Sequence, residues 1–213
     1  MLSAKEIMQV SPIIPVIAIK DASKAVDIAL ALQEGGINIM EITLRTQEAL
    51  GAIEKVVKEL PSMVVGAGTV INSDQFKAVK DVGAKFVISP GMTTSLLEYS
   101  QDIGIAFIPG VATASDIMRA MEYGLDTFKL FPANIVGSID ALKAFSGPFS
   151  NASFCPTGGI ELNNMNNYLS LDNVLCVGGT WICPSKLFDA NDFDGITQLC
   201  KGALASIVRN NNE

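Results

Sequence analysis

The sequence predicts a single (β/α)8 barrel, in which eight parallel strands form a central ring and the helices between them cover its outside. Apolar runs of strand length recur every 20 to 26 residues, and segments with helical spacing of apolar residues lie between them. A length of 213 residues with 49% hydrophobic content is typical of one barrel with a large core. We therefore expect residues 1–213 to form one domain, with a short N-terminal helix.

The eight expected strands are short apolar runs in chain order. Alternation of side chains along each run lets one face point to the centre and the other to the helices. A doubly wound open sheet is the alternative, but the first strand leads into residues 17–21, which contain no glycine. The Gly-x-Gly-x-x-Gly turn that is typical of that alternative is therefore absent. The strands are expected to begin near Ile13, Asn38, Val64, Phe86, Ala106, Thr127, Ser153 and Val174.

The expected helices fill the gaps between the strands. Apolar residues recur at helical spacing in residues 22–34 and 47–60. Thr46, Ser73 and Thr113 are expected to cap helix N-termini, because their hydroxyl oxygens can accept hydrogen bonds from free N–H groups. Glycine commonly follows the last turn of a helix. The expected helix ends are marked by Gly35, Gly36, Gly83, Gly104 and Gly124.

Composition excludes several classes of function. The net charge of −7 argues against nucleic acid or an anionic membrane surface as a partner, because both need a basic stripe. No apolar run reaches the roughly 20 residues of a membrane span and no secretory leader is visible, so we expect a cytoplasmic protein. The absence of histidine removes Ser-His-Asp and Cys-His catalysis. No metal-binding spacing occurs, and buried reduced thiols are expected at Cys155, Cys176, Cys183 and Cys200.

Lys129 lies in the middle of an apolar run, residues 127–132, that predicts a buried strand. Burying an unpaired ammonium costs several kcal/mol, and such a lysine often becomes a nucleophile. Alternation places Lys129 and Phe131 on one face of this strand and Phe128 and Leu130 on the other. In a barrel, the first face looks into the interior near the ends of the strands, where active sites lie.

The second strand adds three polar side chains to the same interior. If the apolar residues of residues 39–45 pack on the helices, then Glu41, Thr43 and Arg45 point inward. Two structural explanations stay open: Lys129 can be held in an ion pair with Glu41 without any chemistry, and Arg45 can simply neutralise Glu41. The coincidence of three ionic groups in an apolar interior favours a functional site.

Glycine and proline turns follow several strands and let a ligand approach the backbone closely. The third strand ends in Gly68 and Thr69, and the fourth leads into Pro90. Thr69, like Thr113, has helix capping as its structural alternative. Tyr99, Tyr123, Tyr168 and Trp181 are expected to pack against the core.

The seventh and eighth strands predict an anion site. Gly158-Gly159 follows the seventh strand before a helix expected to open at Glu161, and Gly178-Gly179 precedes Thr180 at the end of the eighth. In barrels, these two loops commonly bind phosphate through backbone N–H groups. Tight turns that need a positive φ are the structural alternative for the glycines.

Six motifs together resemble the 2-keto-3-deoxy-6-phosphogluconate (KDPG) aldolase family, which also includes 4-hydroxy-2-oxoglutarate (KHG) aldolases. The resemblance runs in order over nearly the whole chain. It is nearer to the gluconate branch, because relatives that act on the galactonate isomer are expected to lack two of these motifs. The motifs are Glu41-Ile42-Thr43-Leu44-Arg45-Thr46, Gly66-Ala67-Gly68-Thr69-Val70, Ile88-Ser89-Pro90-Gly91, Phe128-Lys129-Leu130-Phe131-Pro132-Ala133, Phe154-Cys155-Pro156-Thr157-Gly158-Gly159-Ile160 and Val177-Gly178-Gly179-Thr180-Trp181.

The resemblance implies a class I aldolase, without cofactor or metal, that forms homotrimers of (β/α)8 barrels. It implies cleavage of KDPG to pyruvate and glyceraldehyde 3-phosphate, and extends to KHG. By motif match, Lys129 would form the Schiff base and Glu41 would transfer protons. Thr180 stands where the family is expected to have serine. The remaining matched positions divide between the pyruvyl region, at Arg45, Thr69, Pro90 and Phe131, and the phosphate, at Gly158, Gly159, Gly179 and Thr180.

Two other classes of function stay open at this point. A phosphosugar isomerase would share the glycine loops but would use a base and an acid without a covalent lysine. A non-catalytic barrel would bind phosphorylated keto acids without releasing pyruvate.

Overall fold

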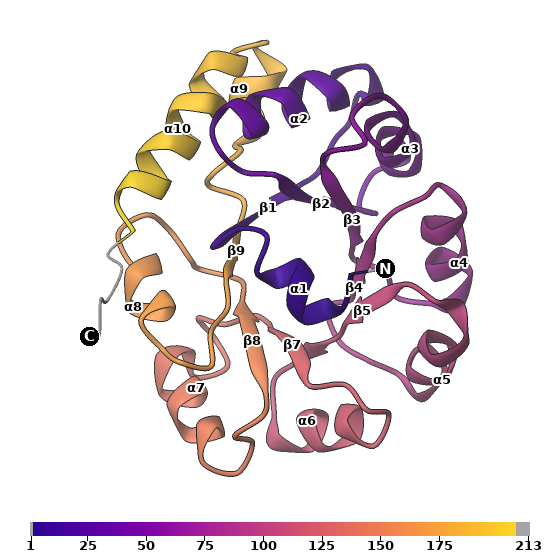
Figure 1. Ribbon diagram of the computed structural model, residues 1–213, viewed down its shortest axis with the longest axis vertical. Helices are drawn as coiled ribbons and strands as arrows, with labels where there is room; N and C mark the ends of the chain where they lie inside the picture. Colours follow the sequence, from indigo (N-terminus) through magenta and orange to yellow (C-terminus); the bar gives the residue numbers. More distant parts are fainter. Residues whose placement is uncertain (1, 208–213) are drawn as a thin grey trace.

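The computed structural model describes residues 2–207 as a set of parallel strands near the centre with helices around the outside (Figure 1). The predicted α/β class is confirmed, since all the strand pairs are parallel. The strands are β1 (Ile13–Ile17), β2 (Ile39–Thr43), β3 (Val64–Gly68), β4 (Phe86–Ile88), β5 (Ala106–Ile108), β6 (Gly110–Val111), β7 (Thr127–Leu130), β8 (Ser153–Pro156) and β9 (Val177–Gly179).

Helices connect the strands, and a short helix precedes the first one as expected. This helix, α1, lies against the end of the molecule where the strands begin, since its first residue, Ala4, shares a cleft with the first residues of β5 and β7. The helical segments are α1 (Ala4–Met8), the 3₁₀ turn η1 (Ala22–Lys24), α2 (Ala25–Glu34), α3 (Ala49–Glu59), α4 (Ser73–Asp81), α5 (Thr94–Ile103), α6 (Ala114–Met121), α7 (Ser138–Ser146), α8 (Met165–Leu169), α9 (Ser185–Asp189) and α10 (Phe193–Ala205).

The hydrogen-bonded ladders differ from the single eight-stranded sheet that was predicted. Six strands pair in the order β5-β4-β3-β2-β1-β9, and three pair in the order β6-β7-β8. Pro109 separates β5 from β6, because proline has no N–H group to donate to a ladder. On the other side, β9 begins at Val177, three residues later than expected, and isolated bridges join Phe154 to Val174 and Thr157 to Gly178.

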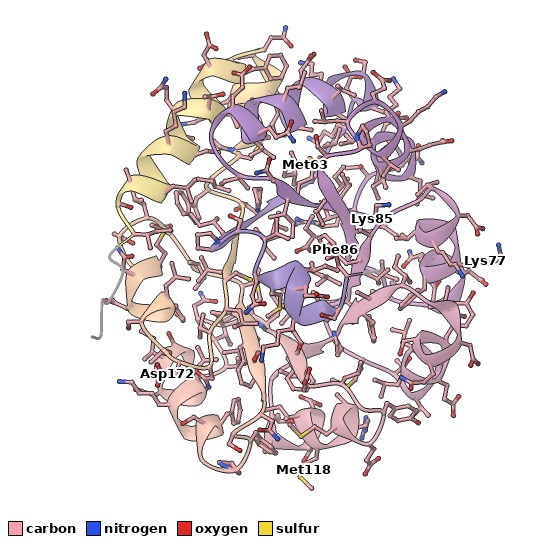
Figure 2. The ribbon with its side chains drawn as sticks, viewed as in Figure 1. Met63, Lys77, Lys85, Phe86, Met118 and Asp172 are labelled. Atoms are coloured by element: carbon pink, nitrogen blue, oxygen red, sulfur yellow. The ribbon has the colours of Figure 1, made fainter. Side chains whose placement is uncertain are left out.

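The core fills the centre and the space between strands and helices. Phe128 and Leu130, on the outward face of β7, are completely buried, and the Phe128 ring lies 5.8 Å from that of Phe154. Phe86 is also fully buried and lies inside the ring, whereas Lys77 projects from the outer surface (Figure 2). Gly66, the register partner of Phe86, has to be glycine because a Cβ atom there would lie 2.4 Å from the Phe86 ring.

Among the three predicted helix caps, one is confirmed and two are wrong. Thr113 caps α6, where its hydroxyl accepts from the Asp116 N–H in a capping box. Ser73 is instead the first residue of α4, because the preceding Asn72 accepts from the Gln75 N–H. The Thr46 hydroxyl donates to the carbonyl oxygen of Ile19 and so ties the end of β2 to the end of β1.

All four cysteines are buried and free of disulfide bonds, as the sequence predicts. Burial raises the pKa of the Cys176 and Cys183 thiols, and it raises the pKa of Cys200 to about 12. These thiols are therefore protonated packing groups at neutral pH. Among residues 2–207, no helix combines the length and the apolar character needed to cross a membrane.

Candidate active site

A buried ion pair joins two strands that are far apart in the sequence. The Lys129 Nζ atom on β7 lies 3.2 Å from Glu41 Oε1 and 3.4 Å from Glu41 Oε2 on β2. The two residues are only 6% and 2% exposed. Removing both groups from water is costly, and the attraction between them in a buried pair offsets only part of that cost. The ion pair that the sequence left open is therefore present, and it does not exclude a chemical role.

Gly68 makes room for the carboxylate of Glu41. A Cβ atom at Gly68 would lie 1.8 Å from Glu41 Oε1, far inside any contact distance. Gly68 ends β3, and its register partner on β2 is Thr43, two residues beyond Glu41. The glycine at the end of the third strand thus leaves space for the carboxylate in the position where it contacts Lys129.

Aromatic and thiol groups complete the surroundings of Lys129. Its ammonium group lies 5.4 Å from the centre of the Phe131 ring, within the range of a cation–π contact. Cys155 is the register partner of Lys129 on β8 and is 2% exposed. The amine therefore lies beside a carboxylate and an aromatic ring, and its register partner on the neighbouring strand is a buried cysteine.

Arg45 does not pair with Glu41, so the expectation that it simply neutralises this acid is wrong. Its Nε–H instead donates to Thr43 Oγ1 at 3.1 Å, and the Thr43 hydroxyl donates to the carbonyl oxygen of Ile17 at 3.1 Å. Arg45 lies beyond the last residue of β2 and is exposed. Its guanidinium group is thus anchored at the rim of the cavity above the buried pair.

Thr69 and Pro90 form the next part of the rim. Thr69 follows β3 with a φ of 60°, a left-handed conformation that a β-branched residue rarely adopts. It is not a helix cap, since Asn72 caps the following helix. Strained backbone of this kind is concentrated at binding and catalytic sites. Gly110 lets Pro90 approach, because a Cβ atom there would lie 2.3 Å from the Pro90 carbonyl group.

The loop after β8 turns sharply at two glycines. Gly158 and Gly159 have φ values of 104° and 70°, so the positive φ that was considered as an alternative is present. The helix expected to open at Glu161 begins only at Met165, because Asn164 folds back on the loop. Its side chain accepts from the Glu161 N–H and donates to the Gly159 carbonyl oxygen. The site at this loop therefore consists of turn backbone, without a helix N-terminus.

The loop after β9 faces that turn. A Cβ atom at Gly178 would lie 2.3 Å from Thr157 Oγ1, and one at Gly179 would lie 2.6 Å from the indole ring of Trp181. Within residues 2–207, the backbone N–H groups of Gly159 and Thr180 have no hydrogen-bond acceptor. Free N–H groups on two facing glycine turns are suited to an anion.

One cavity of about 350 Å³ unites these groups, and all ten residues predicted for the site line it. The sequence also predicted that Thr43 points inward and that Gly178 belongs to the glycine pair of the anion site, but it did not indicate three further lining residues, namely Val16, Thr157 and Ile160. Alternation could have found two of them, because Val16 is the register partner of Glu41 and Thr157 lies two residues after Cys155. The complete lining is Val16, Glu41, Thr43, Arg45, Thr69, Pro90, Lys129, Phe131, Thr157, Gly158, Gly159, Ile160, Gly178, Gly179 and Thr180.

A larger cleft of about 660 Å³ lies at the opposite ends of β7 and β8, beside Asp126 and Ser153. It is lined by exposed lysines and aspartates and contains no buried ion pair. The smaller cavity is the candidate active site, because it lies at the carboxyl ends of parallel strands and holds a buried amine with a carboxylate.

An amine held beside a carboxylate at this end of a parallel α/β fold is typical of enzymes that bind a carbonyl substrate covalently through an imine. Comparison with known proteins identifies the family. The model of the KDPG and KHG aldolase family matches residues 4–199, and the chain belongs to this family.

The relatives and solved structures agree with this assignment. The chain is 46% identical to the KHG/KDPG aldolase of Escherichia coli (strain K12) over 95% of each chain. It is also 46% identical to the 2-dehydro-3-deoxy-phosphogluconate aldolase of Pseudoalteromonas atlantica, over 96% of this chain and 95% of that one. The KDPG aldolase of Legionella pneumophila, solved with pyruvate captured as a covalent carbinolamine, superposes with a TM-score of 0.93 at 44% identity, covering 95% of this chain and 98% of that one.

Proposed function

We propose that the protein is a class I aldolase that cleaves KDPG to pyruvate and D-glyceraldehyde 3-phosphate through a Schiff base on Lys129. The observation that carries this proposal is the buried contact between the Lys129 amine and Glu41 on the wall of a cavity that is also lined by two glycine loops. The cavity thus offers a nucleophile, a proton carrier and an anion site to one elongated substrate. The carbinolamine captured in the Legionella relative supports the covalent step.

The cavity suggests how the substrate lies. The carboxylate and C2 carbonyl would lie toward Lys129, with Arg45, Thr69, Pro90 and Phe131 around the pyruvyl part. The phosphate would lie against Gly158, Gly159, Gly179 and Thr180, where two N–H groups are free among the described residues. This arrangement requires no metal or cofactor in the proposed reaction.

The proposed mechanism uses Lys129 and Glu41 in turn. The neutral amine of Lys129 attacks C2, and Glu41 relays protons while the carbinolamine loses water to give a protonated imine. Glu41 then removes the proton of the C4 hydroxyl group, and the C3–C4 bond breaks with the imine as electron sink. D-glyceraldehyde 3-phosphate leaves, the enamine is protonated at C3, and hydrolysis releases pyruvate and the free lysine.

Borohydride reduction in the presence of pyruvate tests the covalent step. Reduction should trap the imine and add one pyruvyl group to Lys129, located by mass spectrometry of the digested protein. Incubation with borohydride alone is the control for non-specific modification. An unmodified protein, or a pyruvyl group on another lysine, would contradict the proposal.

Glu41→Gln tests the proton transfer. Loss of a positioned acid–base group is expected to lower kcat by about 10²-fold or more, while the circular dichroism spectrum stays the same. Turnover near that of the wild type would remove Glu41 from this role. The assay couples pyruvate release to lactate dehydrogenase.

Cleavage of KHG to pyruvate and glyoxylate is proposed as a second activity of the same site, supported by the name of the E. coli relative. KHG offers the same C2 carbonyl and C4 hydroxyl groups but no phosphate. Comparison of kcat/KM for the two substrates measures how much the recognition of phosphate by the glycine loops contributes to specificity. Equal values would mean that these loops do not recognise phosphate.

We further propose that the two sheets act as one closed (β/α)8 barrel, since the bridge between Thr157 and Gly178 joins β8 to β9. The single domain over residues 1–213, the homotrimer and the cytoplasmic location stay predictions. Size-exclusion chromatography with light scattering tests the trimer. No observation favours a phosphosugar isomerase or a non-catalytic barrel.

A further inference from the structure

Thr43 and Arg45 lie two residues apart at the end of β2, on the face that lines the cavity. Thr43 is 1% exposed, whereas Arg45 is exposed at the rim. A hydroxyl group has one hydrogen to donate and two lone pairs to accept with. Both kinds of site on Thr43 are used in the structure, at 3.1 Å in each case.

Chemistry alone fixes the direction of both hydrogen bonds. A carbonyl oxygen cannot donate, so Thr43 must donate to Ile17 on β1. The Nε–H of Arg45 cannot accept, so Thr43 must accept from Arg45. The hydroxyl therefore presents only lone pairs toward the cavity. It has no hydrogen left for Glu41 or for a substrate oxygen, and its remaining function is to hold a donor.

The bond at Nε determines what Arg45 can offer to a ligand. An exposed arginine side chain has many rotamers, and a fixed Nε–H restricts both its direction and the plane of its guanidinium group. Within the described part of the chain, Thr43 is the one hydrogen-bond partner of Arg45. The two terminal Nη groups are left to bind the two oxygens of a carboxylate side by side.

We propose that Thr43 is a positioning residue that orients Arg45 so that its Nη groups meet the carboxylate of the keto acid. This inference rests on the proposed function, in which Arg45 binds the pyruvyl part of the substrate. The relay from Ile17 through Thr43 to Arg45 couples the end of β1 to the substrate. Its effect falls on binding, because none of its groups contacts the atoms that react at C2 to C4.

The test compares Thr43→Val, which keeps the shape of the side chain without the hydroxyl, with Thr43→Ser, which keeps the hydroxyl. Thr43→Val should raise KM for KDPG about tenfold with kcat within about twofold, because one charge-assisted hydrogen bond is lost. Thr43→Ser should keep both constants within about twofold. The pyruvate concentration that gives half-maximal borohydride trapping should rise in parallel for Thr43→Val alone. Melting temperatures of both variants verify that they fold.

The Arg45→Ala background shows whether Thr43 acts through Arg45 or independently of it. If Thr43 acts through Arg45, then Thr43→Val should change KM by less than about twofold once Arg45 is alanine. A full tenfold effect in that background would overturn the inference and leave the proposed function intact. So would a Thr43→Ser variant as impaired as Thr43→Val, or a fall in kcat without a change in KM. An unchanged KM in Arg45→Ala alone would instead remove Arg45 from the proposed site.

Discussion

Two ion pairs of the molecule each join a lysine to a carboxylate but have very different surroundings. Lys77 and Asp81 lie one turn apart on α4, with side chains 63% and 56% exposed. Lys129 and Glu41 come from β7 and β2, 88 positions apart, with side chains 7% and 2% exposed. Figure 2 shows Lys77 on the outer surface, away from the ring of strands. Within residues 2–207 these are the ion pairs that the structure contains.

The surroundings of an ion pair, rather than the distance between its nitrogen and oxygen atoms, indicate what the pair does. The pair on α4 follows from local helix geometry, because residues i and i+4 are neighbours on one face. Its hydrogen bond raises the pKa of Lys77, but water remains available to both groups. The buried pair requires two distant strands, a glycine that makes room and a cavity that faces it. Such a costly arrangement is typical of a functional site.

The largest expected effect separates chemistry from ion pairing at Lys129. Lys129→Arg keeps a positive charge for Glu41 but cannot form an imine at neutral pH, so pyruvate release should fall by at least about 10³-fold. Borohydride trapping with pyruvate should disappear in the same variant. Substantial turnover by Lys129→Arg would mean that the buried pair has only a structural role, as the pair on α4 does. The coupled lactate dehydrogenase assay measures the loss.

The next effect concerns stability and the cost of breaking a buried pair. Lys129→Met should lower the free energy of unfolding by on the order of 3 kcal/mol, because the Glu41 carboxylate is left buried without a partner. Lys129→Met combined with Glu41→Leu should recover most of that loss, since neither charge is then buried. Urea unfolding measures all three proteins. Equal losses in the single and the double variant would show that the two charges do not stabilise each other.

Moving the carboxylate without removing it gives a smaller effect. Gly68→Ala places a methyl group where Glu41 Oε1 lies, so the acid has to move away from Lys129. We expect kcat to fall about 10²-fold, because small displacements of a catalytic group are costly. Gly51→Ala on α3 is the matched control: its Cβ atom would meet only Ala22, at 4.0 Å. Full activity of Gly68→Ala would show that the position of Glu41 is not critical.

The smallest effect is expected on the surface. Lys77→Gln should leave the melting temperature within about 1 °C of the wild type and leave kcat unchanged, because solvated pairs contribute little. Differential scanning calorimetry at low and high salt measures the melting temperatures of the variant and the wild type. A shift of several degrees would show that burial is not what distinguishes the two pairs.

Much of the fold could be predicted from the sequence, because strands and helices have different periodicities. Most strand starts and most helix ends follow from apolar spacing and glycine positions, and Thr113 follows from local capping chemistry. The break between β5 and β6 follows from Pro109, which lacks an N–H group, whereas the break between β8 and β9 could not be predicted in this way because it depends on how neighbouring strands lie in register. The predicted helix start at Glu161 is also wrong. The Asn164 side chain bonds back to the loop at Glu161 and Gly159, and such a loop conformation leaves no periodic pattern in the sequence.

The site was predictable where alternation and motif resemblance both applied. The alternation of side chains along the two strands predicted that Glu41 and Lys129 both point into the interior of the fold. In the structure these two side chains are in contact. The partner of Arg45 was not predictable, because an exposed side chain can turn toward Glu41 or toward Thr43 and the sequence does not distinguish the two.

The indole ring that lies against Gly179 has a practical consequence. Trp181 is the single tryptophan of the chain, so all indole fluorescence of the protein originates within one glycine loop of the proposed phosphate site. Its ring nitrogen is buried and, in the described part of the chain, has no hydrogen-bond partner. The protein thus contains a native optical probe beside a glycine that lines the cavity. Titration with inorganic phosphate or substrate analogues can follow occupancy there without any label or substitution.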